Sequence, residues 1–288
     1  MEAVRAPGGA VVDSAAAPVT VIRPAEGWLG VNQRELWSYR ELLYFLVWRD
    51  IKVRYKQTVI GVGWAIIQPF FTMVVFTLFF GLLARVPSDG LPYPVFYYAA
   101  LLPWMYFANA LTNATNTVVE HRWVITKIYF PRVLLPMAAV VSGLLDLGIA
   151  LTLLGGMLLF YGVAPGWPIL LLPVFLLLAV ATALGVGLWL SPLNALYRDV
   201  RYAVPFLVQL WMFASPVAYP SSLVPERWRG LYALNPMAGV IEGFRWTLSG
   251  RGSPDFGVMM MSAAIVLALL LGGIVYFNRV ERTLADVI

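Results

Sequence analysis

Residues 48–57 read WRDIKVRYKQ, and residues 58–84 read TVIGVGWAIIQPFFTMVVFTLFFGLLA. The first segment carries five charged side chains in ten residues, whereas the second carries none. The second exceeds the roughly 20 apolar residues that a helix needs to cross the hydrocarbon of a bilayer. The junction therefore predicts a transmembrane helix that begins just after a positively charged threshold.

The composition of the whole chain points to lipid as its solvent. Of 288 residues, 60% are hydrophobic and 12% are charged, whereas soluble domains carry about 25% charged residues. The alternating ten-residue strands of a membrane barrel do not occur, so we expect an all-α membrane protein. No apolar stretch near Met1 reads as a signal peptide.

Six apolar runs predict six transmembrane helices within a domain at 58–278. The first, third, fourth and sixth runs are unambiguous, whereas the second turns polar near its end and the fifth is short and contains Pro205 and Pro216. The runs lie at about 58–84, 95–118, 131–161, 167–190, 202–219 and 256–277.

The segments outside the spans have different characters. Residues 1–33 are rich in Ala, Pro and Gly, and we expect a disordered N-terminal tail. Residues 34–57 predict an amphipathic helix at the membrane interface, because Leu43, Val47, Ile51 and Tyr55 recur every four residues. The expected cytoplasmic C-terminal tail covers residues 279–288.

The distribution of basic residues predicts the orientation. With six spans, both termini lie on one side, and that side holds fifteen of the 20 Lys and Arg residues. Basic loop residues favour the cytoplasmic side. We therefore expect both termini in the cytoplasm.

Several chemistries lack the residues they need. The chain has no cysteine and one histidine, His121, and it contains neither GxxxxGK[ST] nor HExxH. These absences exclude disulfides, a P-loop for ATP and a cysteine-ligated zinc site. Asp146 is the only carboxylate within a confident span, and we favour hydrogen bonding between helices over a transport role for it. A chain of this kind needs a partner to supply energy for uphill transport.

Two cytoplasmic connections suggest partner contacts. Residues 120–132 read EHRWVITKIYFPR and predict a short amphipathic helix, and residues 192–205 read PLNALYRDVRYAVP. Either segment is also consistent with a basic loop that only fixes the topology.

Five motifs in order resemble permeases of type-2 ABC exporters, within the O-antigen and polysaccharide branch of Wzm-like subunits. They are WRDIKVRYKQTVIGVGWAIIQP, KIYFPRVLLP, SPLNALYRDVRYAVPFLVQLWMFASPVAYP, NPMAGVIEGFRW and VERTLADVI. The resemblance implies a homodimer in a bacterial inner membrane with two cytoplasmic ATP-binding subunits. It also implies export of a lipid-diphosphate-linked glycan and short re-entrant periplasmic helices at 220–250. ATP and magnesium would belong to the partner, leaving no cofactor in this chain, and no nucleic-acid partner is expected.

The resemblance and the residues together suggest three groups of site residues. A diphosphate head group would meet Arg49, Lys52, Arg54 and Lys56, although these cations also serve as lipid anchors. The expected channel-lining residues, which could equally pack between helices, are Phe70, Phe71, Tyr97, Tyr98, Trp104, Tyr106, Phe107, Asn109, Asn113, Asn116, Trp211 and Phe213. The expected ATPase-coupling residues are Glu120, His121, Arg122, Trp123, Lys127, Arg198, Asp199, Glu281 and Arg282.

Rival functions are an exporter of teichoic-acid-like polymers, lipids or drugs in the same superfamily, or a membrane-bound transferase acting on lipid-linked sugars. The scarcity of carboxylates and the single histidine argue against the transferase.

Overall fold

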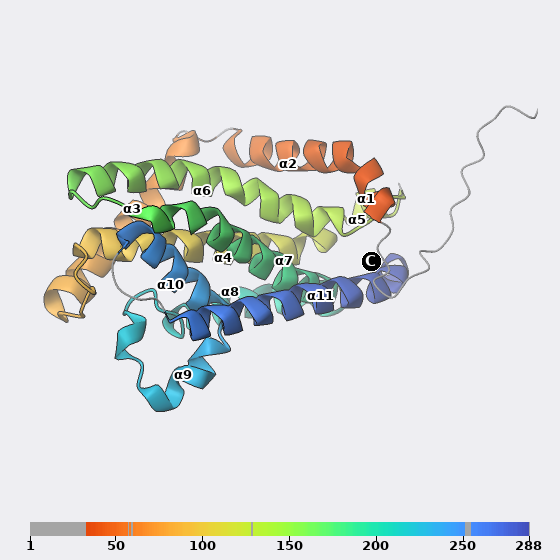
Figure 1. Cartoon of the computed structure of the whole chain (residues 1–288). Helices are drawn as coiled ribbons and strands as arrows, with labels where there is room; N and C mark the ends of the chain where they lie inside the picture. The colour runs from red at the N-terminus through yellow and green to blue at the C-terminus, as the bar shows by residue number, and fades with distance from the viewer. Residues whose placement is uncertain (1–32, 57, 59, 128, 251–254, 288) are drawn as a thin grey trace, which may run out of the picture.

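The structure, a computed structural model, describes residues 33–287 apart from 57, 59, 128 and 251–254, with side chains from Leu36 to Glu281. Every regular element in this part of the chain is helical (Figure 1). The expected all-α class is therefore confirmed. The expected tail at 1–33 falls outside the described residues except for Gln33, which begins the first helix.

The elements follow one another as α1 (Gln33–Ser38), α2 (Arg40–Tyr55), η1 (Gly61–Gly63), α3 (Trp64–Phe76), the π-helical η2 (Thr77–Leu83), α4 (Tyr93–Glu120), α5 (Arg122–Ile125), α6 (Leu134–Phe160), η3 (Trp167–Leu171), α7 (Leu172–Leu196), α8 (Val200–Phe213), η4 (Ser221–Leu223), α9 (Glu226–Ala233), α10 (Pro236–Ser249) and α11 (Phe256–Val287).

Four helical segments are long and apolar enough to cross a membrane by length and composition. They are Gly61–Leu83, Leu134–Phe160, Trp167–Leu196 and Phe256–Glu281. These segments correspond to the four runs that the sequence marked as unambiguous. α4 has the length, but its second half is rich in Asn and Thr, and α8 is apolar but has only 14 residues. The count of six spans stays a prediction.

α4 is the central helix of the bundle. It packs against α3, α6, α7, α8 and α10, and residues 95–102 are at most 2% exposed. α11 covers α7 at a close crossing between two glycines. A Cβ on Gly185 would lie 2.9 Å from the backbone nitrogen of Leu270, and one on Gly273 would lie 2.6 Å from the carbonyl oxygen of Gly185. Small residues let membrane helices approach in this way.

α2 lies alongside α6 (Figure 1). The stripe of Leu43, Val47, Ile51 and Tyr55 is half-buried, and Leu46 is buried in a cluster that includes Leu134, Leu135 and Ala138 of α6. The stripe therefore faces α6, and the expected single helix is broken at Tyr39 into α1 and α2. The outward face carries exposed aromatic side chains, namely Tyr44, Phe45 and Trp48.

The two ends of the bundle differ. α1, α5 and the C-terminal end of α11 lie at one end, whereas α9 lies toward the other (Figure 1). Residues 279–287, expected as part of a tail, are instead the last turns of α11. Their Glu, Arg, Leu and Ala residues are good helix formers. The end with α1 and α5 is called the coupling end below.

Candidate functional site

A charged contact joins α2 to the middle of α6. Arg54 donates to one carboxylate oxygen of Asp146, and the hydroxyl of Tyr55 donates to the other. Arg54 also donates to Ser142 Oγ at 3.2 Å. Burial, together with the bond to Asp146, raises the pKa of the Tyr55 phenol to about 12, so the hydroxyl remains a donor at neutral pH. The carboxylate of Asp146 is therefore paired and satisfied, as a charge inside a membrane protein must be.

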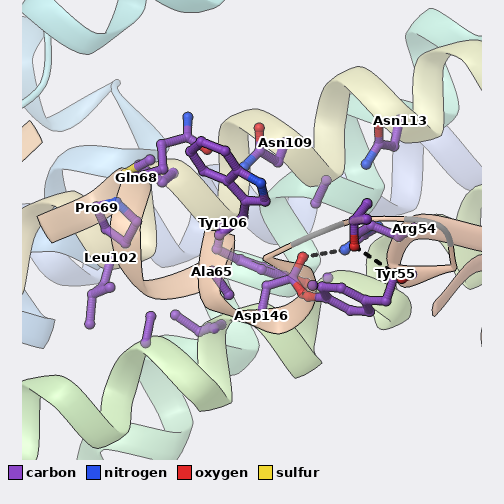
Figure 2. Close-up of a pocket in the computed structure, with 18 residues that line it drawn as sticks. Arg54, Tyr55, Ala65, Gln68, Pro69, Leu102, Tyr106, Asn109, Asn113 and Asp146 are labelled. Atoms are coloured by element: carbon purple, nitrogen blue, oxygen red, sulfur yellow. Dashed lines mark hydrogen bonds and ion pairs between the residues drawn. The ribbon is translucent and has the colours of Figure 1, made fainter. Parts of the chain in front are cut away.

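A cavity of about 330 Å³ lies beside this contact and is called the inner cavity (Figure 2). Arg54, Tyr55 and Asp146 line one part of it, and Asn109 and Asn113 on α4 line another. Other lining residues come from η1 and α3, among them Trp64, Ala65, Gln68 and Pro69. The cavity thus combines a guanidinium, a carboxylate and amide groups with apolar walls, and it can hold a hydrated or polar ligand.

A second cavity of about 300 Å³ lies nearer the coupling end and is called the outer cavity. It is lined by Arg49, Asp50, Val53, Arg54, Asn113, Thr117, Glu120, His121, Ala139 and Ser142. Nε2 of His121 lies 2.6 Å from Nη2 of Arg49, and its Nδ1 lies 2.8 Å from the Thr117 carbonyl oxygen. A carbonyl oxygen can only accept, so Nδ1 carries the proton and Nε2 accepts from Arg49.

The four cations expected at a head group do not form one cluster. Arg49 and Arg54 line the outer cavity, where Arg49 is held by Asp50 at 2.9 Å. Lys52 and Lys56 are exposed on α2 and line neither cavity. Lys52 instead lies 5.2 Å from the ring centre of Trp48, within the range of a cation–π contact. The structure therefore brings two of the four together.

The expected channel residues also separate into groups. Asn109, Asn113 and Tyr106 line the inner cavity, whereas Asn116 accepts a 3.0 Å bond from Asn194 of α7. Phe70, Phe71 and Phe213 are exposed on the surface of the bundle. The others pack within it: Tyr97, Tyr98, Trp104 and Phe107 are buried, and half-buried Trp211 lies edge-on to Trp104 and Phe107. Packing between helices thus accounts for five of the nine aromatic residues that were expected to line a channel.

The expected coupling residues lie mostly at the coupling end. Arg122, Trp123 and Lys127 are exposed, and Lys127 lies 4.3 Å from the ring centre of Trp123. The short helix expected within residues 120–132 has only four residues, since α4 extends to Glu120 and α5 spans Arg122–Ile125. On the α7–α8 connection, Arg198 and Asp199 are exposed.

The remaining expected coupling residues are His121, Glu281 and Arg282. His121 faces Arg49, as described above. Glu281 Oε1 accepts a 2.8 Å bond from the backbone N–H of Arg132, so this carboxylate links α11 to the segment before α6. The side chain of Arg282 lies outside the described residues.

Two buried arrangements were missed from the sequence. The first is Ser142, which supports Arg54; the presence of one carboxylate in a span was a signal that a nearby cation would pair with it. The second is Arg245 of α10, which is buried, donates to the Pro216 carbonyl at 2.7 Å and lies 3.7 Å from the ring centre of Phe96. No sequence pattern indicated that contact.

These features define a class of protein. A helical bundle with four membrane-length apolar helices and a partly polar cavity between α2, α3, α4 and α6 has the architecture of a multi-pass membrane protein. Within the part of the chain that the structure describes, no group of three His, Asp or Glu side chains could hold a metal ion.

Comparison with known proteins identifies the family. Residues 41–249 match the ABC-2 type transporter family, and the chain belongs to it. It is the membrane subunit of a transporter and not an enzyme.

Named relatives match along most of the chain. An O-antigen export system permease protein RfbA of Myxococcus xanthus is 33% identical over 241 residues, which cover 82% of this chain and 91% of the relative. A protein of the same name from Klebsiella pneumoniae is 26% identical, covering 86% and 95%. A polysialic acid transport protein KpsM of Escherichia coli is 20% identical, covering 83% and 93%.

Proposed function

We propose that this chain is the permease subunit of an ATP-driven exporter that moves a lipid-diphosphate-linked, O-antigen-like polysaccharide from the cytoplasm to the periplasm. The observation that carries the proposal is the 33% identity to an O-antigen export permease along 82% of the chain. The named relatives from three organisms all export or transport polysaccharides, which supports a glycan as the cargo.

The energy comes from a partner subunit. ABC-2 permeases work with an ATP-binding partner, and this sequence contains no P-loop motif of its own. We propose a homodimer of this chain with two ATP-binding subunits, which hold the ATP and magnesium. Exposed Trp123 and Lys127 on the coupling end, together with Arg198 and Asp199, would contact that partner.

The proposed topology has six spans in a bacterial inner membrane, with both termini in the cytoplasm. α4, with 28 residues, is about 42 Å long at 1.5 Å per residue and reaches across the hydrocarbon. α8 is shorter, and the buried turn through Val217 and Ala218 extends it. α9 and α10 would be the re-entrant pair at the periplasmic end, since neither has the length to cross.

The diphosphate of the lipid carrier would enter at the coupling end. Arg49 and Arg54 line the outer cavity there, and guanidinium groups bind phosphate oxygens in pairs. Lys52 and Lys56 would attract the anionic carrier from the outward face of α2. The glycan would follow a path beside the amides and aromatic rings of α4, completed by the second copy of the chain.

An ATPase assay tests this function. The chain is co-expressed with its ATP-binding partner, and the purified complex is placed in nanodiscs with a polyprenyl diphosphate that either carries or lacks a glycan. We expect the two subunits to co-purify and the glycan-bearing lipid to stimulate ATP hydrolysis, while the chain alone hydrolyses no ATP. ATP hydrolysis by the isolated chain would contradict the proposal. So would a complex whose ATP hydrolysis is stimulated by none of the lipid-linked glycans.

A further inference from the structure

Two side chains form a common wall between the inner and outer cavities. Among the residues that the structure describes, Arg54 and Asn113 alone line both. The outer cavity reaches toward His121 and Glu120 at the coupling end, and the inner one reaches toward Leu102 in the middle of α4. A ligand that passes from one cavity to the other must therefore pass Arg54.

Each arginine of the outer cavity is already paired within the protein. Arg49 bonds to Asp50, and Arg54 bonds to Asp146. The side chains of Arg54 and Asp146 are 29% and 32% exposed, so both can be reached from the cavities. Arg54 and Asp146 thus neutralise each other, and an incoming anion gains the full charge of Arg54 only by replacing Asp146.

We propose that Asp146 and a diphosphate group compete for Arg54, so that Arg54 is a gate that opens when the diphosphate replaces the carboxylate. This inference rests on the proposed lipid-diphosphate-linked substrate and adds a regulatory step to that site.

The chemistry of the two anions favours the exchange. A carboxylate carries one negative charge, whereas a diphosphate carries at least two and offers oxygens on both phosphorus atoms to a planar guanidinium. Asp146 does not become an isolated charge, since the Tyr55 hydroxyl still donates to it. Ser142 likewise remains beside Arg54 as a neutral partner.

The exchange also has a mechanical consequence. Arg54 belongs to α2 and Asp146 to α6, so their bond fastens one helix to the other. When the diphosphate takes Arg54, it places negative charge beside the Asp146 carboxylate, and the two anions repel. We expect the C-terminal end of α2 to separate from α6 and to open the wall between the cavities.

Binding measurements on Asp146→Asn test the competition. Asparagine has the same shape but keeps one acceptor oxygen, which can accept from Arg54 while its amide N–H donates to the Tyr55 oxygen, and it lacks the competing charge. The full chain in neutral-lipid nanodiscs is titrated with inorganic pyrophosphate and with a glycan-free polyprenyl diphosphate, and phosphatidylglycerol serves as a third anionic ligand. We expect Asp146→Asn to bind the diphosphates about tenfold more tightly than wild type, as one charge-assisted bond no longer has to be broken.

Two further variants test whether the effect depends on the position of the charge and on the guanidinium of Arg54. Glu41→Gln removes the same charge from an exposed position on α2 and should leave the affinity unchanged. Arg54→Lys keeps the charge without the planar pair of donors and should weaken binding about tenfold. Hydrogen exchange in residues 48–55 should rise when wild type binds the ligand and should already be raised in Asp146→Asn.

The outcomes separate the inference from the proposed function. Tighter binding of both diphosphates by Asp146→Asn, or of the polyprenyl form alone, supports the exchange; the second result adds that the lipid chain is needed. If wild type binds the polyprenyl diphosphate but Asp146→Asn binds it equally or less tightly, the exchange is wrong and the substrate assignment stands. If Asp146→Asn also bound phosphatidylglycerol about tenfold more tightly, and Glu41→Gln bound the diphosphates as tightly as Asp146→Asn does, the effect would be one of overall charge and the exchange would be wrong. Failure of wild type to bind any diphosphate overturns both proposals.

Discussion

Arg49 of α2 and His121, which directly follows α4, meet at 2.6 Å between Nη2 and Nε2. His121 is held in turn by the Thr117 carbonyl at 2.8 Å. This contact connects α2 to the residue that lies between α4 and α5. We therefore expect movement of α5 to be transmitted to α2 through this contact.

His121 substitutions test this connection. His121→Ala removes the acceptor of Arg49, so motion of α5 reaches α2 less efficiently. We expect the complex to keep its ATP hydrolysis while transport falls about tenfold, the equivalent of one or two lost hydrogen bonds. His121→Gln offers a carbonyl oxygen to Arg49 and should restore most of the transport. Normal transport by His121→Ala would show that the contact between Arg49 and His121 is not needed to couple α5 to α2.

Gly185 should tolerate no side chain at the crossing of α7 and α11. A Cβ there would lie 2.9 Å from the Leu270 nitrogen and 3.0 Å from its Cα, and backbone cannot move aside as a flexible side chain can. We expect Gly185→Ala to destabilise the protein by about 1–3 kcal/mol, measured by unfolding in detergent.

Gly148→Ala is the matched control. Gly148 also lies within a transmembrane helix, but its Cβ would meet nothing within 4 Å. Alanine should therefore stabilise the helix there by about 0.5–1 kcal/mol. Equal effects of the two substitutions would contradict the close helix crossing.

Asn235 organises the start of α10 and is a second stability test. Its Oδ1 accepts from the Met237 N–H at 3.0 Å and from Trp211 Nε1 at 2.8 Å, and its Nδ2 donates to Ser215 at 2.9 Å. Asn235→Ala removes the helix cap and leaves the indole N–H of Trp211 without its acceptor. We expect the free energy of unfolding to fall by about 2–4 kcal/mol. Asn235→Asp keeps the acceptor and should cost less. Exposed Ser222→Ala should change the thermal midpoint little, and an equally small change for Asn235→Ala would contradict the network.

Some of the fold could be predicted because the signals are local. The runs at 58–84, 131–161, 167–190 and 256–277 need only length and apolar composition, and all four are membrane-length helices in the structure. Asn235 followed by Pro236 is likewise a local pattern typical of a helix start, and the Asn235 side chain caps α10.

The site depended on contacts between distant residues, which no local pattern encodes. Arg54 and Asp146 are 92 residues apart, and Arg49 and His121 are 72 apart. Arg49 and Arg54 directly precede the first apolar run in the sequence, but no local pattern shows that Asp146 pairs with Arg54. In the same way, aromatic abundance did not reveal that Tyr98 and Tyr106 bond to carbonyls of α6.

Glu281 provides a prediction about the C-terminal helix. Because its carboxylate accepts from the Arg132 N–H, Glu281→Ala should speed hydrogen exchange of that amide, whereas Glu281→Gln retains an acceptor and should change it less. Peptides covering residues 129–134 report the difference. Identical exchange in wild type and Glu281→Ala would mean that α11 does not stabilise the segment before α6.

We propose that this chain forms the membrane path for a lipid-linked glycan and that ATP hydrolysis in another subunit drives the movement of the glycan. The most direct measurement is translocation in proteoliposomes that contain the complex in one orientation, scored by the access of an impermeant glycan-binding protein to the far side. We expect fluorescent lipid-linked glycan to cross the proteoliposome membrane only when ATP and both subunits are present. Translocation by the chain without its partner, or no translocation by a complex that hydrolyses ATP with every lipid-linked glycan supplied, would contradict it.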